Sequence, residues 1–128
     1  MIYLDTSVAL AALFAETNRP PNRLWSEPLV ASRLLEYELL VRINARGLGR
    51  AAVVAARTLL DGTALVDLGP PVLARALKPF PLTVRTLDAM HLATMDFLRG
   101  QGLELEVATY DKRLAAAAAA MGFPLATV

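Results

Sequence analysis

MIYLDTS (residues 1–7) is the stretch that decides the fold. Residues 2–5 form an apolar, strand-like run that ends in Asp5, and Thr6 or Ser7 can cap a helix over the apolar residues that follow. In an open sheet of parallel strands, ligands collect at the carboxyl ends of the strands, at the point where the strand order reverses. Asp5 therefore stands where binding or catalysis is expected.

The rest of the chain alternates short apolar strands with helical segments, which predicts an α/β fold with a parallel sheet covered on both faces. We expect one domain over residues 1–128, because no internal repeat and no long linker divides the sequence. The predicted strands are 2–5, 29–31, 64–68, 104–109 and 125–128. The predicted helices run from the first cap to about residue 15, from Ser32 to about residue 47, and over 50–60, 72–78, 86–100 (capped by Thr86) and 112–121.

Composition limits the classes of function. The 128 residues are 55% hydrophobic with a mean hydropathy of +0.44. No apolar block approaches the ~18 residues that span a bilayer, so we expect no membrane association. No basic stretch precedes an apolar one at the start, which argues against a secretory signal. The absence of cysteine excludes disulfides and thiolate metal sites and fits a cytoplasmic location. A net charge of +1 gives no bulk signal for nucleic-acid binding.

Four carboxylates stand out by position. Asp5 and Asp111 each end a strand-like run, while Glu38 and Asp88 lie in helix-like segments with apolar neighbours. Acids gathered at one edge of a sheet repel one another and lose hydration, and a divalent cation is the usual reason that a fold tolerates them. Their oxygens are of the type that Mg²⁺ and Mn²⁺ prefer.

Each acid also has a simpler interpretation. Asp5 and Asp111 can each cap the helix that follows, and Asp88 can complement the dipole of its own helix from the first turn. Glu38 lies on an apolar helix face, where an unpaired charge costs several kcal/mol, and Arg42 at i+4 is its one sequence-adjacent partner.

Three further polar residues have interpretations of their own. His91 is the only histidine, so without other His or Cys ligands we interpret it as a hydrogen-bonded structural residue and not as part of a zinc site. Asp96 has Arg99 at i+3 and is interpreted as part of a solvated ion pair. Arg85 is the cation expected beside the acids, or else an ordinary surface arginine.

An ordered set of motifs resembles the PIN-domain ribonucleases and, within them, the VapC-type toxins of bacterial and archaeal toxin–antitoxin pairs. The set covers almost the whole chain in the order of the family. Its members are YLDTS (3–7), Ser32 followed six residues later by Glu38, RTLDAMHLAT (85–94), TYDKRL (109–114) and the alanine-rich helix with MGFP (121–124).

The resemblance implies a three-layer α/β/α sandwich with a parallel sheet of four to five strands, in which the first and fourth strands are adjacent. The acidic quartet of the family maps onto Asp5, Glu38, Asp88 and Asp111, which are then the catalytic and metal-binding residues. The supporting hydroxyls map onto Thr6 and Thr109. The expected function is an Mg²⁺- or Mn²⁺-dependent endoribonuclease that acts as the toxin of a type II toxin–antitoxin pair.

RNA binding beside four acids requires a basic rim. The candidates for this rim are Arg42, Arg46, Arg50, Arg85 and Lys112. The resemblance further implies a homodimer and a cognate antitoxin, for which the apolar first helix (Val8, Ala12, Leu13, Phe14) and Trp25 could form a groove, unless these residues are simply core.

Two alternative functions stay open at this point. One is a PIN-type nuclease that matures RNA without being a toxin, and the other is a non-catalytic metal-binding regulatory domain. A nucleotide-binding module is poorly supported, because neither a G-x-G-x-x-G nor a G-x-x-x-x-G-K-[ST] motif occurs.

Overall fold

A computed structural model describes residues 1–15 and 17–128 and has a parallel β-sheet at its centre. The sheet order is β3-β2-β1-β4, so the first and fourth strands are neighbours as expected. Its four strands are β1 (Ile2–Leu4), β2 (Leu29–Ser32), β3 (Ala64–Val66) and β4 (Glu106–Ala108). Because β1 lies between β2 and β4, the chain order reverses beside β1, and this is the switch point at which α/β sheets bind ligands.

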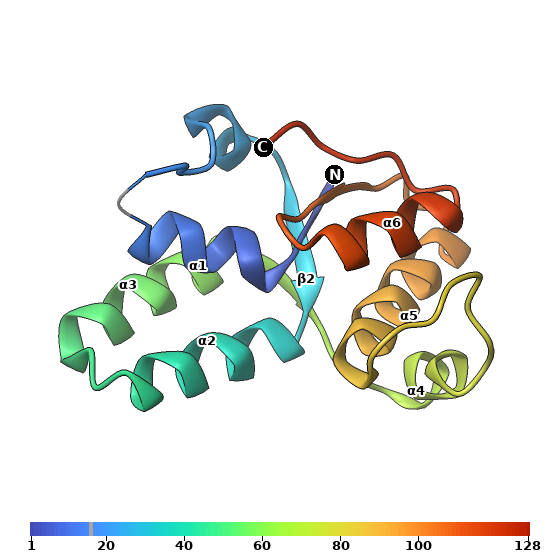
Figure 1. The fold of residues 1–128 in the computed structure, drawn as a ribbon, viewed down its shortest axis with the longest axis horizontal. Helices are drawn as coiled ribbons and strands as arrows, with labels where there is room; N and C mark the ends of the chain where they lie inside the picture. The colour runs from blue at the N-terminus through green and yellow to red at the C-terminus, as the bar shows by residue number, and fades with distance from the viewer. Residues whose placement is uncertain (16) are drawn as a thin grey trace.

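Helices cover both faces of the sheet, which confirms the predicted three-layer sandwich (Figure 1). The helices are α1 (Thr6–Phe14), the 3₁₀ turn η1 (Asn22–Ser26), α2 (Leu34–Ala45), α3 (Gly49–Asp61), α4 (Pro70–Ala76), α5 (Thr86–Gly100) and α6 (Lys112–Ala120). In Figure 1, α1, α2 and α3 lie on one side of the strand β2, while α4, α5 and α6 lie on the other.

Strand alternation divides the core into two halves. Ile2 and Leu4 pack with helices α1, α2 and α3, whereas Tyr3 between them packs with α5 and α6. Val30 of β2 and Val107 of β4 join Tyr3 on that second face. Successive side chains of a strand point to opposite faces of a sheet, so a three-residue strand serves both layers.

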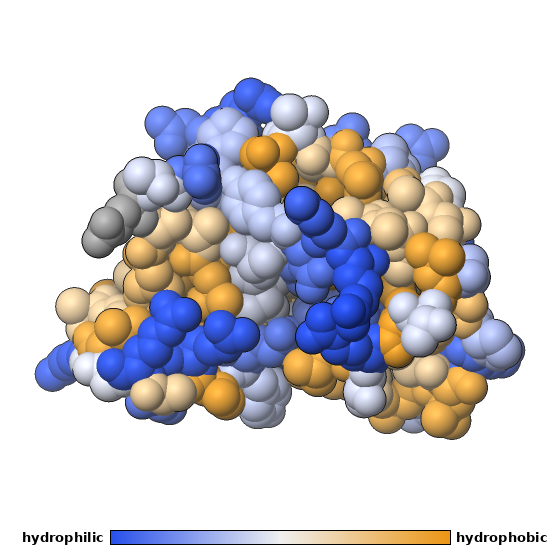
Figure 2. Space-filling model, in the orientation of Figure 1, coloured by the Kyte–Doolittle hydropathy of each residue, from blue (hydrophilic) through white to orange (hydrophobic). Residues whose placement is uncertain are grey.

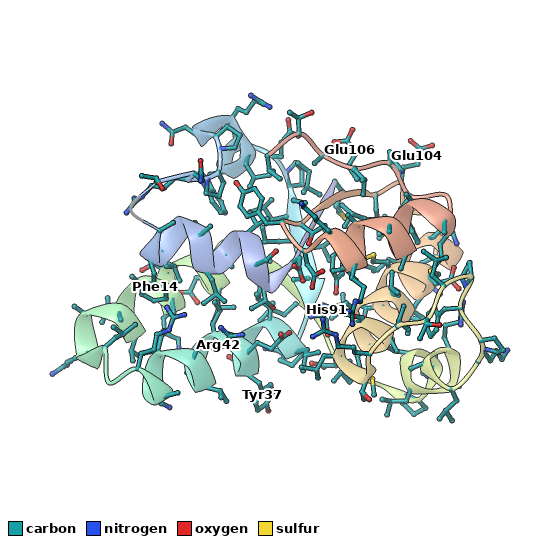
Figure 3. All side chains as sticks on the ribbon, in the orientation of Figure 1. Phe14, Tyr37, Arg42, His91, Glu104 and Glu106 are labelled. Carbon is teal, nitrogen blue, oxygen red and sulfur yellow. The ribbon has the colours of Figure 1, made fainter. Side chains whose placement is uncertain are left out.

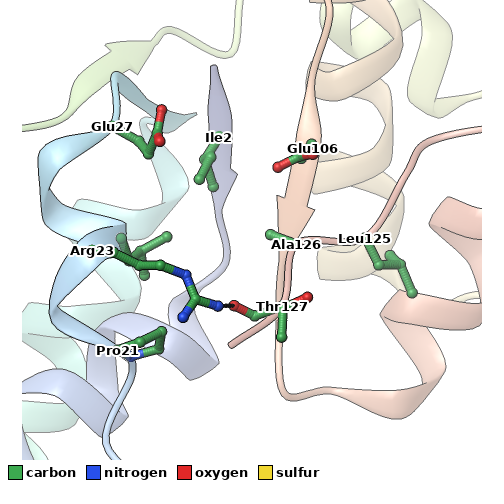
Figure 4. Close-up of a pocket in the computed structure, with 9 residues that line it drawn as sticks. Ile2, Pro21, Arg23, Glu27, Glu106, Leu125, Ala126 and Thr127 are labelled. Atoms are coloured by element: carbon green, nitrogen blue, oxygen red, sulfur yellow. Dashed lines mark hydrogen bonds between the residues drawn. The ribbon is translucent and has the colours of Figure 1, made fainter.

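The predicted fifth strand at residues 125–128 is wrong as a strand. The segment makes one isolated bridge, between Leu125 and Val107, and then leaves the sheet. Arg23 holds it there instead, by donating from its guanidinium to the carbonyl of Thr127 at 3.1 Å. Figure 4 shows this contact at the mouth of a pocket of about 210 Å³ that Ile2 and Glu106 also line, at the amino ends of β1 and β4.

No helix among the described residues is both long enough and apolar enough to cross a membrane.

Candidate active site

Asp5 lies immediately after β1 and caps α1. Its backbone N–H donates to the carbonyl of Ala108 at 3.0 Å, which places it beside the end of β4. Its Oδ2 accepts three hydrogen bonds, from the N–H and the hydroxyl of Ser7 and from the hydroxyl of Thr109, the last at 2.8 Å. No hydrogen bond among the described residues uses Oδ1. The residue is 6% exposed, so one half of a buried carboxylate is held and the other half is left open.

Asp111 follows β4 and caps α6. Its Oδ1 accepts from the backbone N–H groups of Arg113 at 2.9 Å and Leu114 at 3.2 Å. Its own N–H donates to the hydroxyl of Thr109 at 3.0 Å. Thr109 therefore joins Asp5 to Asp111, and the capping interpretation of both acids is correct as a description of local structure.

Glu38 lies on α2 and turns its carboxylate toward α1 and α5. Its Oε1 accepts from the hydroxyl of Thr6 at 3.0 Å and lies 2.7 Å from Nε2 of His91. Arg42 is not its partner, so the alternative of a surface ion pair between the two is wrong for the described residues. The partners that a carboxylate on an apolar helix face requires therefore come from two other elements, α1 and α5.

Asp88 lies in the first turn of α5 and accepts a long hydrogen bond, 3.4 Å, from the backbone N–H of Arg85. The N-cap is Arg85 and not Thr86, because residue 86 already has helical geometry. Asp88 is one turn before His91 and on the same helix face.

His91 and Tyr3 belong to this site, although sequence reasoning gave neither a role in it. His91 is 2% exposed and its Nδ1 lies 2.7 Å from the hydroxyl of Tyr3. Burial, above all, raises the pKa of Tyr3 well above its ordinary value, and the nearby charges of Asp5 and Glu38 raise it further, so the phenol keeps its proton. The available signal was a polar residue within the buried stretch 91–95 of α5.

The four acids share one arrangement. Each uses one oxygen to accept from protein donors, and no hydrogen bond among the described residues uses the other. No buried side-chain N or O atom of this part of the chain lacks a partner, so the open oxygens are reached by solvent. Three of the four acids also lie at helix N-termini, where the dipole favours negative charge.

The donor set fits a hard divalent cation in chemical type, because solvent-reached carboxylate oxygens are what Mg²⁺ and Mn²⁺ bind. As the side chains are placed, however, no three His, Asp or Glu residues within residues 1–15 and 17–128 form one group that could hold an ion. The contacts join Asp5 to Asp111 through Thr109, and Glu38 to α1 through Thr6. Metal binding by the quartet therefore remains a prediction.

The predicted rim residues are exposed. Arg42, Arg46 and Arg50 lie along α2 and the start of α3, and Lys112 opens α6. Figure 2 shows hydrophilic surface along α2 and again at the centre of the same face beside α6. Arg85 is also exposed, and it lines a mainly apolar pocket of about 430 Å³ between α4 and α5.

Two other sequence interpretations are refined by the structure. Val8 is fully buried and belongs to the core, so it cannot line a groove, whereas Trp25 is 37% exposed. Trp25 and Ala12 line a pocket of about 360 Å³ beside α3. Asp96 accepts from Arg75 at 2.6 Å as well as from the expected Arg99 at 2.8 Å.

A family model described as PIN domain matches residues 2–120 of the chain. Ribonuclease VapC47 of Mycobacterium tuberculosis (strain CDC 1551 / Oshkosh) is 34% identical over 134 residues, which cover 99% of this chain and 96% of that protein. Ribonuclease VapC46 of Mycobacterium tuberculosis (strain ATCC 25618 / H37Rv) is 33% identical over 125 residues, which cover 94% of this chain and 92% of that protein.

Two solved structures share the fold. The crystal structure of Mycobacterium tuberculosis VapC20, described as a sarcin-ricin loop cleaving toxin, has a TM-score of 0.69 at 24% identity and covers 91% of this chain and 95% of its own. A chain of a toxin–antitoxin complex from Klebsiella pneumoniae has a TM-score of 0.71 at 18% identity and covers 99% of this chain and 97% of its own. At these identities the likeness shows a common architecture.

Proposed function

Since the chain belongs to the PIN-domain family and, within it, to the VapC group, we propose that it is an endoribonuclease that depends on Mg²⁺ or Mn²⁺. In this proposal it is the toxin of a type II toxin–antitoxin pair. Two relatives that match nearly the whole chain carry the name ribonuclease, which supports RNA as the substrate class.

The observation that carries the proposal is the shared arrangement of Asp5, Glu38, Asp88 and Asp111. All four motif acids are present, and each has one oxygen that accepts from a protein donor and one that does not. Holding one oxygen fixes the plane of a carboxylate, so the free oxygen is presented in a defined direction. The four residues would hold the cation through these free oxygens.

When bound, the cation supplies an activated water and offsets negative charge on the scissile phosphate. This chemistry requires no side-chain nucleophile, because the activated water attacks the phosphate. The hydroxyls of Ser7 and Thr109 donate to Asp5, and the hydroxyl of Thr6 donates to Glu38. These three residues therefore orient the acids and do not attack the substrate.

RNA would be held by the exposed arginines and lysine of the rim, above all Arg42 and Arg85. The positive charges of the rim attract the phosphates, whereas the acids in the middle repel them. RNA binding therefore depends on the rim. Single-stranded or loop RNA is the expected form, because its bases can splay out for recognition.

The partners in this proposal are a cognate antitoxin and a second copy of the chain. The pocket between α1, η1 and α3 is apolar at Ala12, Trp25 and Leu59 and would bind a helix of the antitoxin. Co-purification with a small protein encoded beside this one, and light scattering of the free protein, test the two partners separately.

Cleavage mapping on total cellular RNA tests the proposal. We expect defined cuts with Mg²⁺ or Mn²⁺, none in the presence of a chelator, and none with the Asp5→Asn variant. Undiminished cleavage by folded Asp5→Asn protein would overturn the catalytic assignment. If the wild-type protein cleaves but does not arrest growth when it is expressed alone, the nuclease role stands and the toxin role fails.

A further inference from the structure

We propose that Tyr3 and His91 are positioning residues, which hold the carboxylate of Glu38 through a one-way chain of hydrogen bonds that starts at the backbone of Ser32. This inference rests on the proposed function to the extent that Glu38 acts as a site acid. It assigns a role to two buried polar side chains beside the site.

This chain of hydrogen bonds runs without a gap across four elements. The backbone N–H of Ser32, at the end of β2, donates to the hydroxyl oxygen of Tyr3 on β1 at 3.2 Å. That hydroxyl lies 2.7 Å from Nδ1 of His91 on α5, and Nε2 of the same ring lies 2.7 Å from Oε1 of Glu38 on α2. Each step joins elements from different parts of the sequence, so the chain forms only when the sheet and both helices are in place.

The direction of each bond follows from which atoms carry protons. An ionised Glu38 has no proton to give, so Nε2 of His91 must carry the hydrogen of that contact. In a neutral ring Nδ1 is then an acceptor, and the Tyr3 hydroxyl donates to it. The Tyr3 oxygen in turn accepts from the N–H of Ser32. Every atom is satisfied with one neutral tautomer of His91, and the opposite tautomer would face Glu38 with a lone pair.

The surroundings keep the chain rigid. Tyr3 and Ser32 are 0% exposed and His91 is 2% exposed, so water does not compete for their bonds. The rings of Tyr3 and His91 meet edge to face, 84° apart with centroids 6.0 Å from each other. Figure 3 shows His91 directed into the middle of the molecule, between the two helical layers.

Glu38 is the acid of the four that its own backbone constrains least. Asp5, Asp88 and Asp111 are held by N–H groups next to them in the sequence, whereas Glu38 lies in mid-helix and has no such donor. Thr6 and His91 replace these local donors from outside the helix. Loss of an outer hydrogen-bond partner of a ligand typically costs about 10- to 100-fold in metal affinity or activity.

A matched pair of substitutions separates positioning from packing. In His91→Gln the side-chain amide nitrogen can occupy the place of Nε2 and still donate to Glu38. In His91→Asn the shorter amide can occupy the place of Nδ1, so it meets Tyr3 and leaves Glu38 without this donor. Each variant loses one bond of the ring, and we expect both to lose similar stability in urea unfolding.

Their catalytic effects should differ. We expect His91→Asn to lower kcat for RNA cleavage about 10- to 100-fold with KM little changed, and His91→Gln to recover most of that loss. Tyr3→Phe, which frees Nδ1, should fall between the two. Equal losses in His91→Gln and His91→Asn would mean that His91 is only a packing residue and would overturn the inference.

A readout independent of activity comes from the single histidine of the chain, whose ring nitrogens give unambiguous NMR signals. We expect the Nε2–H tautomer in the wild type, and a change in its signals in Glu38→Ala. The Nδ1–H tautomer would overturn the hydrogen-bond directions. If the tautomer is as expected and wild-type protein does not cleave RNA, the proposed hydrogen bonds stand and the proposed function fails. If Asp5→Asn abolishes cleavage and His91→Asn cleaves like wild type, the function stands and the positioning role fails.

Discussion

The hydroxyl of Thr109 donates to Oδ2 of Asp5 at 2.8 Å and joins residues 104 positions apart at the ends of β4 and β1. The same oxygen accepts from the N–H and hydroxyl of Ser7, so three donors converge on one atom. An asparagine offers the same kind of acceptor oxygen without the charge. The structural role of Asp5 can therefore be separated from the role of its charge.

Asp5→Asn should fold like the wild type and lose activity. Asparagine and aspartate cap helices about equally well, so the free energy of unfolding should change little. We expect RNA cleavage to fall about 100-fold or more, the scale on which loss of one electrostatic contributor lowers kcat. Asp61→Asn, at the exposed end of α3, is the matched control and should keep full activity. Equal activity in the two variants would contradict the assignment.

Asp111 allows a similar separation with two substitutions. Asp111→Ala removes the acceptor of the Arg113 and Leu114 N–H groups and should cost about 1 kcal/mol of unfolding free energy, whereas Asp111→Asn should not. Both should lose cleavage if the charge of Asp111 serves the site. Urea unfolding and RNA cleavage measured on the same samples check this. Full activity in Asp111→Asn would leave Asp111 as a helix cap alone.

Asp96 should stabilise the fold without serving the site. It joins Arg75 of α4 to Arg99 of α5, and these two arginines also lie over the rings of Phe80 and Phe123. Asp96→Asn keeps the shape but removes the charge, so we expect a loss of about 1 kcal/mol at neutral pH. RNA cleavage by the folded variant should equal that of the wild type.

The stability that Asp96 provides should depend on pH in one direction. Burial alone would raise the pKa of Asp96, but hydrogen bonds and charge from Arg75 and Arg99 outweigh it and lower the pKa from its ordinary value of 3.8. A carboxylate with a lowered pKa in the folded state stabilises the fold above the ordinary value and loses that contribution as pH falls through the folded value. The difference in unfolding free energy between wild type and Asp96→Asn should therefore shrink below pH 3.8. A gap that widened in acid would refute the argument.

Arg42 and Arg85 should affect RNA binding more than the chemical step. Each lost phosphate contact should raise KM and reduce the salt dependence of binding to single-stranded RNA by about 0.7 in the log–log slope. Binding measured by fluorescence anisotropy at several salt concentrations gives both values. Arg23→Gln, at the amino end of the strands, is the control and should leave the slope unchanged. A lower kcat with unchanged KM in Arg42→Gln would remove Arg42 from the rim.

Strand and helix order could be predicted from the sequence because apolar periodicity and capping residues act locally. The predictions are wrong where contacts in the folded protein override the preference of the local sequence. Residues 125–128 are apolar enough for a strand, but the chain turns away after one bridge and Arg23 takes the carbonyl of Thr127. Thr86 is a better capping residue than Arg85, yet the backbone becomes helical one position earlier than a Thr86 cap requires.

The partners of the site acids could be predicted only in part. The caps at Asp5 and Asp111 use neighbouring backbone groups, so the sequence shows them. The partners of Glu38 come from α1 and α5, 32 and 53 positions away, and no periodicity encodes which donors a helix face will meet. The position of Glu38 on an apolar face predicted that some partner must exist, but not that His91 supplies it.

The pocket that Ile2 and Thr127 share has a practical consequence for experiments. The first strand begins at Ile2, at the end of the sheet opposite to Asp5, whereas Val128 lines a pocket together with Tyr110, the residue before Asp111. Figure 1 shows the two ends of the described chain on the same side of the molecule. A fluorophore, biotin handle or tether fused before Met1 would leave Asp5 and Asp111 facing bulk solvent, whereas one fused after Val128 would lie beside Tyr110 and Asp111. Single-molecule and sensor-surface assays can therefore be built on this protein without altering any internal loop.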